Sequence, residues 1–192
     1  MNKAVFIDKD GTLIKDVPYN VNPELIFLND NIAEVLSILR DNGYLLILVS
    51  NQAGIAKGFF SKEELMIASS KIIELLAEES AYLDAYYYCP HHPEGTMPEF
   101  SVSCSCRKPA PGMLLMAARE HNIDLSQSWM IGDILDDMEA GKRAGCKTIF
   151  YNNGNETAWE MNAFRKPDYV ISDLLEAAGI IYGKQEYSVG NF

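Results

Sequence analysis

Short apolar segments alternate along the chain with segments whose apolar residues recur at helical spacing. Residues 4–7 (Ala-Val-Phe-Ile) and 44–49 (Tyr-Leu-Leu-Ile-Leu-Val) are continuous apolar runs of strand length. Between them, the apolar residues of 31–42 recur every three or four positions, which predicts a helix, and Gly43 follows where a C-terminal helix cap is expected. Further strands are predicted at 84–88, 129–131, 147–151 and 169–171, and further helices at 61–80, 111–122, 136–144 and 174–178.

Strands that alternate with helices are typical of a parallel sheet with helices on both faces. We therefore predict an α/β fold with three layers, α/β/α, around a central parallel sheet. No repeat or linker divides the sequence, so residues 1–192 are expected to form one domain. The irregular segment over 89–107 is the longest loop of this plan, and loops of that length in compact domains are usually functional.

Composition narrows the classes of partner. The chain has 16 Lys and Arg against 27 Asp and Glu, which gives a net charge of −11. Such a chain has no overall attraction for DNA, RNA or an anionic membrane. Charge alone would also argue against an anionic small molecule. No apolar run is long enough to cross a membrane, and Asp8 interrupts the N-terminal apolar run before a signal peptide could form, so we expect a cytoplasmic protein.

Two carboxylates directly follow the first predicted strand. Asp8 and Asp10 stand in the segment Asp-Lys-Asp-Gly-Thr, in which Gly11 allows a sharp turn. In open α/β sheets, ligands bind at the carboxyl ends of the strands. The pair is therefore a candidate site for catalysis or for a metal, although a solvated acidic turn would have the same residues.

The loop over 89–107 carries a second group of candidate ligands. Cys89, His91, Cys104 and Cys106 offer three thiolates and an imidazole, which is the donor set of a closed, structural zinc site. His92 competes with His91 for the fourth position, and the Cys-x-His spacing favours His91. Free cysteines or a disulfide are the alternatives, and without an export signal a metal site is favoured over a disulfide.

The segment from Asp8 to Thr12 resembles the first motif of the haloacid dehalogenase superfamily of phosphatases. This resemblance implies a Rossmann-like fold, with a minimal cap because no insertion here is large enough for a cap domain. It also implies that Asp8 is the nucleophile, which becomes phosphorylated, and that Asp10 is the general acid and base. Attack on phosphorus needs an ionised carboxylate, whereas the leaving oxygen needs a proton, so two aspartates with different tasks suit the chemistry.

Later parts of the chain resemble the remaining motifs of the same superfamily. Ser50, after the strand at 44–49, would hydrogen-bond the phosphoryl group, and Lys108 would neutralise its charge. Gly-Asp-x-x-x-Asp at 132–137 would supply Asp133 as a magnesium ligand and Asp137 as a supporting residue. Magnesium would be held by Asp8, the backbone carbonyl of Asp10 and Asp133, because Mg²⁺ prefers hard oxygen ligands.

The segments Cys-Pro-His-His-Pro-x-Gly (89–95) and Cys-x-Cys-Arg-Lys-Pro-x-Pro-Gly-Met (104–113) narrow the resemblance to a family that removes the C7 phosphate of a heptose 1,7-bisphosphate. Its members are usually monomers, and lipopolysaccharide synthesis uses such heptoses. The substrate contacts that it implies are Asp16, Tyr19, Asn51, Gln52 and Arg107.

Two alternatives remain at this point. One is a related phosphatase for histidinol phosphate or another small phosphate ester. The other is a non-catalytic binding protein stabilised by zinc.

Overall fold

The structure is a computed structural model that describes residues 1–183, and its centre is a parallel sheet of six strands in the order β3-β2-β1-β4-β5-β6. The strands are β1 (Lys3–Ile7), β2 (Tyr44–Asn51), β3 (Ala85–Cys89), β4 (Trp129–Gly132), β5 (Lys147–Tyr151) and β6 (Tyr169–Ile171). The helices are α1 (Ile32–Asp41), α2 (Ala53–Ala56), α3 (Lys62–Glu78), α4 (Gly112–Glu120), α5 (Leu135–Ala144) and α6 (Leu174–Tyr182), with short 3₁₀ turns η1 (Pro23–Leu25) and η2 (Leu125–Gln127).

The order of the strands reverses at β1. Strand β1 pairs with β2 on one side and with β4 on the other, so the chain builds the sheet outward from the centre in two directions. The loops that follow β1 and β4 leave the sheet at the same edge and separate there. In sheets of this kind, that point is where a crevice for ligands forms.

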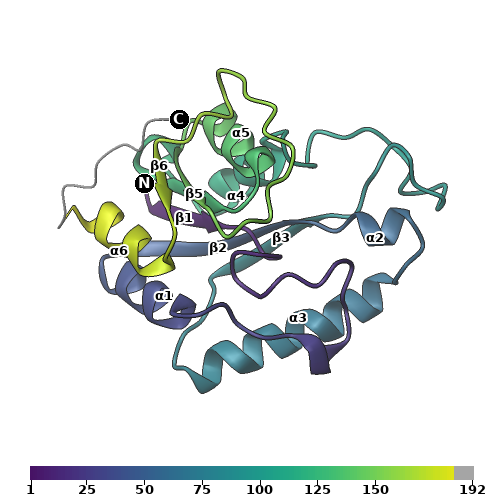
Figure 1. Cartoon of the computed structure of the whole chain (residues 1–192), viewed down its shortest axis with the longest axis horizontal. Helices are drawn as coiled ribbons and strands as arrows, with labels where there is room; N and C mark the ends of the chain where they lie inside the picture. The colour runs from purple at the N-terminus through teal and green to yellow at the C-terminus, as the bar shows by residue number, and fades with distance from the viewer. Residues whose placement is uncertain (184–192) are drawn as a thin grey trace.

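Alternate residues of the strands enter two apolar cores. Val5 and Ile7 of β1 pack into a core with α1, α3 and α6, whereas Ala4 and Phe6 pack into a second core with α4 and α5. Figure 1 shows these two groups of helices on opposite faces of the sheet. The α/β/α expectation is therefore confirmed, since a parallel sheet needs apolar cover on both faces.

The differences from the predicted elements lie at their ends. Strand β2 continues through Ser50 and Asn51, which the apolar pattern placed after the strand. Helix α5 begins at Leu135 and α6 extends to Tyr182, one residue earlier and four residues later than predicted. The short helix α2 was not predicted, because four residues are too few to show a helical period.

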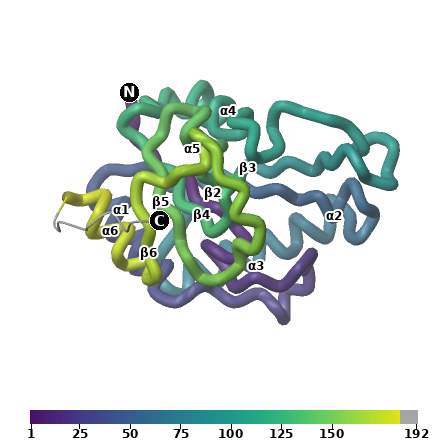
Figure 2. The backbone as a smooth tube through the Cα atoms, turned by 45° about the horizontal axis from the view of Figure 1, so that its top comes forward, coloured from purple at the N-terminus to yellow at the C-terminus, as the bar shows by residue number. Residues whose placement is uncertain are grey.

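Helix α2 and the loop over 89–107 lie together on one side of the molecule (Figure 2). The carbonyl oxygen of Ala56 accepts hydrogen bonds from the amides of Thr96 (2.8 Å) and Met97 (2.9 Å). Two segments distant in sequence are thus fixed beside the carboxyl ends of β2 and β3.

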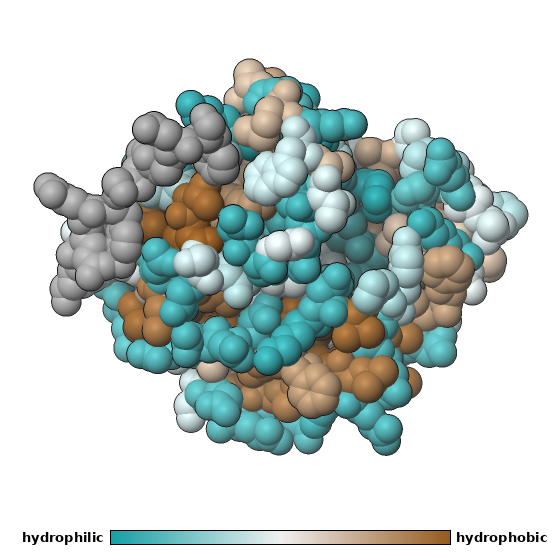
Figure 3. Space-filling model, viewed as in Figure 1, coloured by the Kyte–Doolittle hydropathy of each residue, from teal (hydrophilic) through white to brown (hydrophobic). Residues whose placement is uncertain are grey.

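The surface in the view of Figure 3 is largely hydrophilic, with separate apolar patches. Exposed apolar side chains on α3 include Met66, Ile67 and Ile73. Within residues 1–183, none of the helices is both long and apolar enough to cross a membrane.

Candidate functional site

A buried ion cluster lies at the carboxyl ends of β1 and β4. Asp8 follows β1, and its backbone amide continues the sheet by donating to the carbonyl of Ile131 (3.0 Å). The Lys108 side chain is 1 % exposed, and its ammonium contacts the Asp8 carboxylate, the Asp137 carboxylate (2.6 Å) and the carbonyl of Val49 (3.1 Å). Lys108 therefore joins two loops that are far apart in the sequence.

Burial perturbs the pKa of each charged group in this cluster. The pKa of Asp8 is raised to about 7, chiefly by burial and, against the opposing charge of Lys108, also by the charges of Asp137 and Asp10. Burial likewise raises the pKa of Asp137 to about 6, again opposed by Lys108. Burial lowers the pKa of Lys108, but the two carboxylates outweigh that effect and keep it above its ordinary value. Lys108 is therefore protonated at neutral pH.

Asp133 brings a third carboxylate to the cluster. Oxygen atoms of Asp8, Asp133 and Asp137 all lie within 4.8 Å of one another. Burial, and then the charge of Asp8, raise the pKa of Asp133 to about 6. Three buried carboxylates against one ammonium leave negative charge uncompensated, and their hard oxygens suit a divalent cation such as Mg²⁺. The residues present therefore fit a magnesium ion.

Asp10 lies apart from that cluster, and its side chain is about one third exposed. Gln52 links it to Ser50, because its side-chain nitrogen donates to the Asp10 carboxylate (3.0 Å) and contacts the Ser50 hydroxyl oxygen (2.6 Å). Lys9, which is buried, pairs with the other Asp10 oxygen at 2.9 Å. The two aspartates of the first motif therefore have different surroundings.

A pocket of ≈ 250 Å³ opens beside Asp10. Its lining includes Asp10 and all of the residues predicted to contact substrate: Asp16, Tyr19, Asn51, Gln52 and Arg107.

Within this pocket, Asn51 and Arg107 have different hydrogen-bonding states. The Asn51 amide donates to the carbonyl of Lys108 and accepts from its amide, both at 3.0 Å, so it fixes the backbone that carries the lysine. Among residues 1–183, Arg107 Nη1 is buried without a hydrogen-bond partner, which leaves a donor for an anion.

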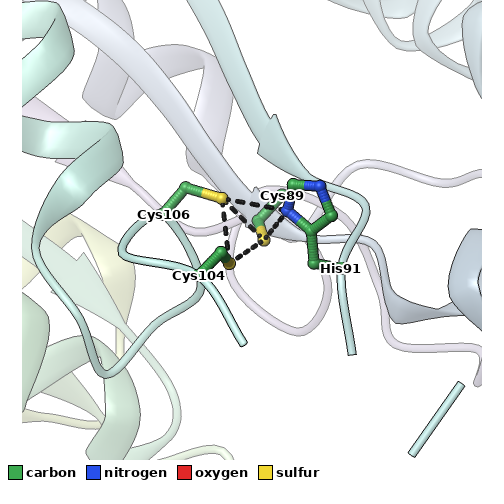
Figure 4. Close-up of side chains that lie close together, drawn as sticks. All are labelled: Cys89, His91, Cys104 and Cys106. Carbon is green, nitrogen blue, oxygen red and sulfur yellow. Dashed lines mark hydrogen bonds between the residues drawn. The ribbon is translucent and has the colours of Figure 1, made fainter. Parts of the chain in front are cut away.

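Three cysteines and a histidine converge at the base of the 89–107 loop (Figure 4). The Cys106 sulfur lies 3.0 Å from that of Cys89 and 3.2 Å from that of Cys104, and 3.4 Å from His91 Nδ1. In a tetrahedral site with Zn–S bonds of about 2.3 Å, the sulfurs lie roughly 3.8 Å apart, so these sulfurs would move apart by less than about 1 Å to hold a zinc ion.

His92 points elsewhere in the same loop. Its Nδ1 accepts a hydrogen bond from the Glu94 amide (3.1 Å). Of the two histidines, His91 is therefore the one that lies where it could complete the metal site.

The sequence reasoning missed side chains that surround Asp133 and the first turn. Thr12 donates to Asp133 Oδ1 (3.2 Å), and Asn153 and Asn155 both contact Oδ2. Asn29 donates to the carbonyls of Gly11, Thr12 and Ile14, which fixes the turn after β1. The sequence did offer a signal for the two asparagines. They stand in the run Asn-Asn-Gly-Asn at 152–155, directly after the predicted strand at 147–151, and that strand ends at the same edge of the sheet as the site.

Comparisons with known proteins agree with this geometry. Residues 105–177 match the family model described as "HAD-hyrolase-like". The chain is 40% identical over 184 residues to a D-glycero-beta-D-manno-heptose-1,7-bisphosphate 7-phosphatase from Pasteurella multocida (strain Pm70), covering 95% of this chain and 98% of the relative. It is 45% identical over 181 residues to the protein of the same name from Photorhabdus laumondii subsp. laumondii, covering 94% and 95%.

A solved structure resembles the chain over nearly its whole length. The crystal structure of D,D-heptose 1,7-bisphosphate phosphatase from B. bronchiseptica, complexed with magnesium and phosphate, superposes with a TM-score of 0.82 at 27% sequence identity. The match covers 95% of this chain and 99% of that one.

Proposed function

Because the chain belongs to the heptose-1,7-bisphosphate 7-phosphatases of the haloacid dehalogenase-like hydrolases, we propose that it removes the C7 phosphate of D-glycero-β-D-manno-heptose 1,7-bisphosphate. The observation that carries the proposal is the buried cluster of Asp8, Asp133, Asp137 and Lys108 beside a pocket lined by Arg107. Phosphoryl transfer depends mainly on positioning and on compensation of charge, and this arrangement supports both.

Asp8 is the proposed nucleophile. Its carboxylate oxygen attacks phosphorus, and the bond between phosphorus and the C7 oxygen breaks to leave a phosphoaspartate. The contact with the protonated Lys108 favours the ionised carboxylate that this attack requires, against the effect of burial. Lys108 and Ser50 then bind oxygens of the phosphoryl group.

Asp10 is the proposed general acid and base. It lines the pocket in which the sugar would lie, whereas Asp8 does not line this pocket and is almost completely buried. Asp10 donates its proton to the C7 oxygen as the alcohol leaves. It then takes a proton from a water molecule, which attacks phosphorus and releases phosphate and the free Asp8.

Magnesium would be held by Asp8, Asp133 and the backbone carbonyl of Asp10, and it supplies positive charge that stabilises the transferring phosphoryl group. Asp137 remains a supporting residue, because it holds the Lys108 ammonium. Zinc, held by Cys89, His91, Cys104 and Cys106, would have a structural role, since four protein ligands leave no open position.

The pocket residues are the proposed substrate contacts. Arg107 is suited to the C1 phosphate, because its planar fork can bind an anion at two points and its Nη1 lacks a partner within residues 1–183. Asp16 and Tyr19 stand on the opposite loop and would bind sugar hydroxyls. Gln52 would position both Asp10 and Ser50.

We also predict that the protein is a monomer and that it is located in the cytoplasm.

A phosphate-release assay with Mg²⁺ tests the substrate. The comparison includes both anomers of the heptose bisphosphate, fructose 1,6-bisphosphate and histidinol phosphate, and phosphorus NMR of the product identifies which phosphate was removed. We expect the highest kcat/KM for the β-anomer, with heptose 1-phosphate as product. A higher kcat/KM for histidinol phosphate would contradict the substrate assignment.

The Asp8→Asn variant separates an enzyme from a binding protein. The amide is isosteric but not nucleophilic, so we expect phosphate release to fall to background while the fold is retained. Release at the wild-type rate would refute the phosphoaspartate chemistry.

A further inference from the structure

Two amide side chains of one loop bind the same carboxylate oxygen. Asp133 Oδ2 accepts hydrogen bonds from Asn155 Nδ2 (2.7 Å) and from Asn153 Nδ2 (3.2 Å). Both asparagines belong to the loop that follows β5, whereas Asp133 follows β4. This loop therefore contributes to the acidic cluster without adding another charge to it.

The two oxygens of Asp133 differ as a result. A carboxylate oxygen offers about two lone-pair directions, so two amide donors saturate Oδ2. Oδ1 accepts only the Thr12 hydroxyl (3.2 Å) among the hydrogen bonds found within residues 1–183. The arrangement leaves Oδ1 with the remaining capacity for a cation.

Asn153 also connects Asp133 with the turn that carries Asp10. Its Nδ2 donates to the carbonyl of Gly11 (2.8 Å) as well as to Asp133. Space is tight at this point, because a Cβ on Gly11 would lie 2.0 Å from Asp133 Oδ2 and 2.6 Å from Asn155 Nδ2. The amides, the glycine turn and the carboxylate therefore form one packed unit.

The loop itself is held in place by contacts between the two asparagines and by contacts of the residues that follow them. Asn153 Oδ1 accepts the backbone amide of Asn155 (3.0 Å), and Glu156 accepts the amide of Leu135 at the start of α5 (2.8 Å). Trp159 packs on Phe150 of β5 with ring centroids 5.4 Å apart. The two asparagines are themselves exposed residues, so they contribute little to the apolar cores.

We propose that Asn153 and Asn155 are positioning residues that fix the Asp133 carboxylate for Mg²⁺, with Oδ1 as the coordinating oxygen. The inference rests on the proposed magnesium-dependent function and extends it to residues outside the four sequence motifs. Partners of this kind orient a metal ligand, and their loss typically weakens metal binding about 10–100-fold.

Direct titration of Mg²⁺ into the metal-free protein by calorimetry tests the proposal. We expect Kd to rise about 10-fold in Asn153→Ala and in Asn155→Ala, and roughly 100-fold in the double variant. Asn152→Ala is the matched control, because Asn152 stands on the same loop and holds the Ile171 carbonyl through its backbone amide (2.8 Å). Thermal unfolding without Mg²⁺ checks that each variant is folded.

Kinetics provide a second measurement that a general loss of structure would not reproduce. In the double variant, the Mg²⁺ concentration for half-maximal phosphate release should rise by a larger factor than KM for the sugar phosphate measured at saturating Mg²⁺. Wild-type Mg²⁺ affinity in the double variant, or an equal loss in Asn152→Ala, would overturn the inference and leave the proposed function standing. A wild-type protein that binds no Mg²⁺ would overturn both.

Discussion

At the scale of single residues, Asp8 and Asp10 differ chiefly in burial and in partner. Asp8 is buried against Lys108, whereas Asp10 faces the pocket and is linked through Gln52 to Ser50. The first surroundings favour a carboxylate that attacks phosphorus, and the second favour a group that exchanges protons with substrate and water. Their roles can therefore be separated by changing the leaving group.

Replacement of Asp10 by asparagine removes the proposed proton donor and keeps the shape of the side chain. We expect kcat for the heptose bisphosphate to fall about 10²–10⁴-fold, the usual contribution of a general acid. With p-nitrophenyl phosphate the loss should be much smaller in a single-turnover measurement, because p-nitrophenolate leaves without a proton. Equal losses for the two substrates would contradict the assignment of the acid. Asp30→Asn, at an exposed acid paired with Lys15, is the control.

Replacement of Lys108 by methionine leaves Asp8 and Asp137 buried without their counter-charge. Breaking a buried ion pair in this way costs about 3–5 kcal/mol of unfolding free energy. Lys142→Met is the matched control: Lys142 pairs with Asp168, but both side chains are partly exposed, so about 1 kcal/mol or less is expected. Urea unfolding of both variants without metal provides the measurement. Similar losses would contradict the electrostatic account of the cluster.

At the scale of elements, the cysteine loop leads directly into the buried ion cluster around Lys108. Cys106 belongs to the cysteine and histidine group that could hold a metal ion, and Arg107 and Lys108 are the next two residues. Asn51 at the end of β2 then clamps the Lys108 backbone through two hydrogen bonds. A loop fixed by a metal ion would thus hold in place the two residues that would bind phosphate.

The Cys104→Ser variant tests this link. We expect the purified protein to lose zinc and its phosphate release to fall at least about 10-fold, because hard hydroxyl oxygen is a poor replacement for thiolate at such a site. Cys146→Ala is the control, since Cys146 is a buried cysteine in the core between the sheet and α4 and α5. Elemental analysis and the release assay are the measurements. Full zinc content or unchanged kinetics in Cys104→Ser would refute a structural role for the loop.

The elements were largely predictable because each carries a local pattern. Every predicted strand and helix occurs, and the Ser61–Glu64 capping box at the start of α3 is formed in both directions. The ends were less predictable: Ser50 and Asn51 are polar but still pair with β3. Hydrogen bonding to a neighbouring strand, which one segment cannot reveal, decided where β2 ends.

At the scale of the whole molecule, the net charge of −11 says little about the ligand. Part of the negative charge is gathered in the buried cluster of three aspartates, where it would be met by a cation. Lys9, Arg107 and Lys108 lie at the same sheet edge. The net charge of the chain therefore does not exclude a local site for an anion such as phosphate.

Magnesium should stabilise the whole fold, because the cation offsets repulsion among buried carboxylates that join β1, β4 and α5. At a Mg²⁺ concentration of about 100 times Kd, the stabilisation is about 2.7 kcal/mol. For a chain of this size that corresponds to a rise in Tm of roughly 5–10 °C. Asp133→Asn should show little of this rise. Differential scanning calorimetry with and without Mg²⁺ is the measurement, and an unchanged wild-type Tm would argue against the site.

The sequence by itself determined the alternation of strands and helices and the cysteine and histidine candidates for a metal site, because periodicity and spacing are local properties, and its motifs carried the resemblance to a family. Only the tertiary structure decided which side chains form ion pairs, which donate to the same carboxylate oxygen and which line the same pocket. Lys108 meets Asp8 across 100 residues, and Asn155 meets Asp133 from a different loop. Such contacts depend on strand order, because β1 and β4 become neighbours only when the sheet forms.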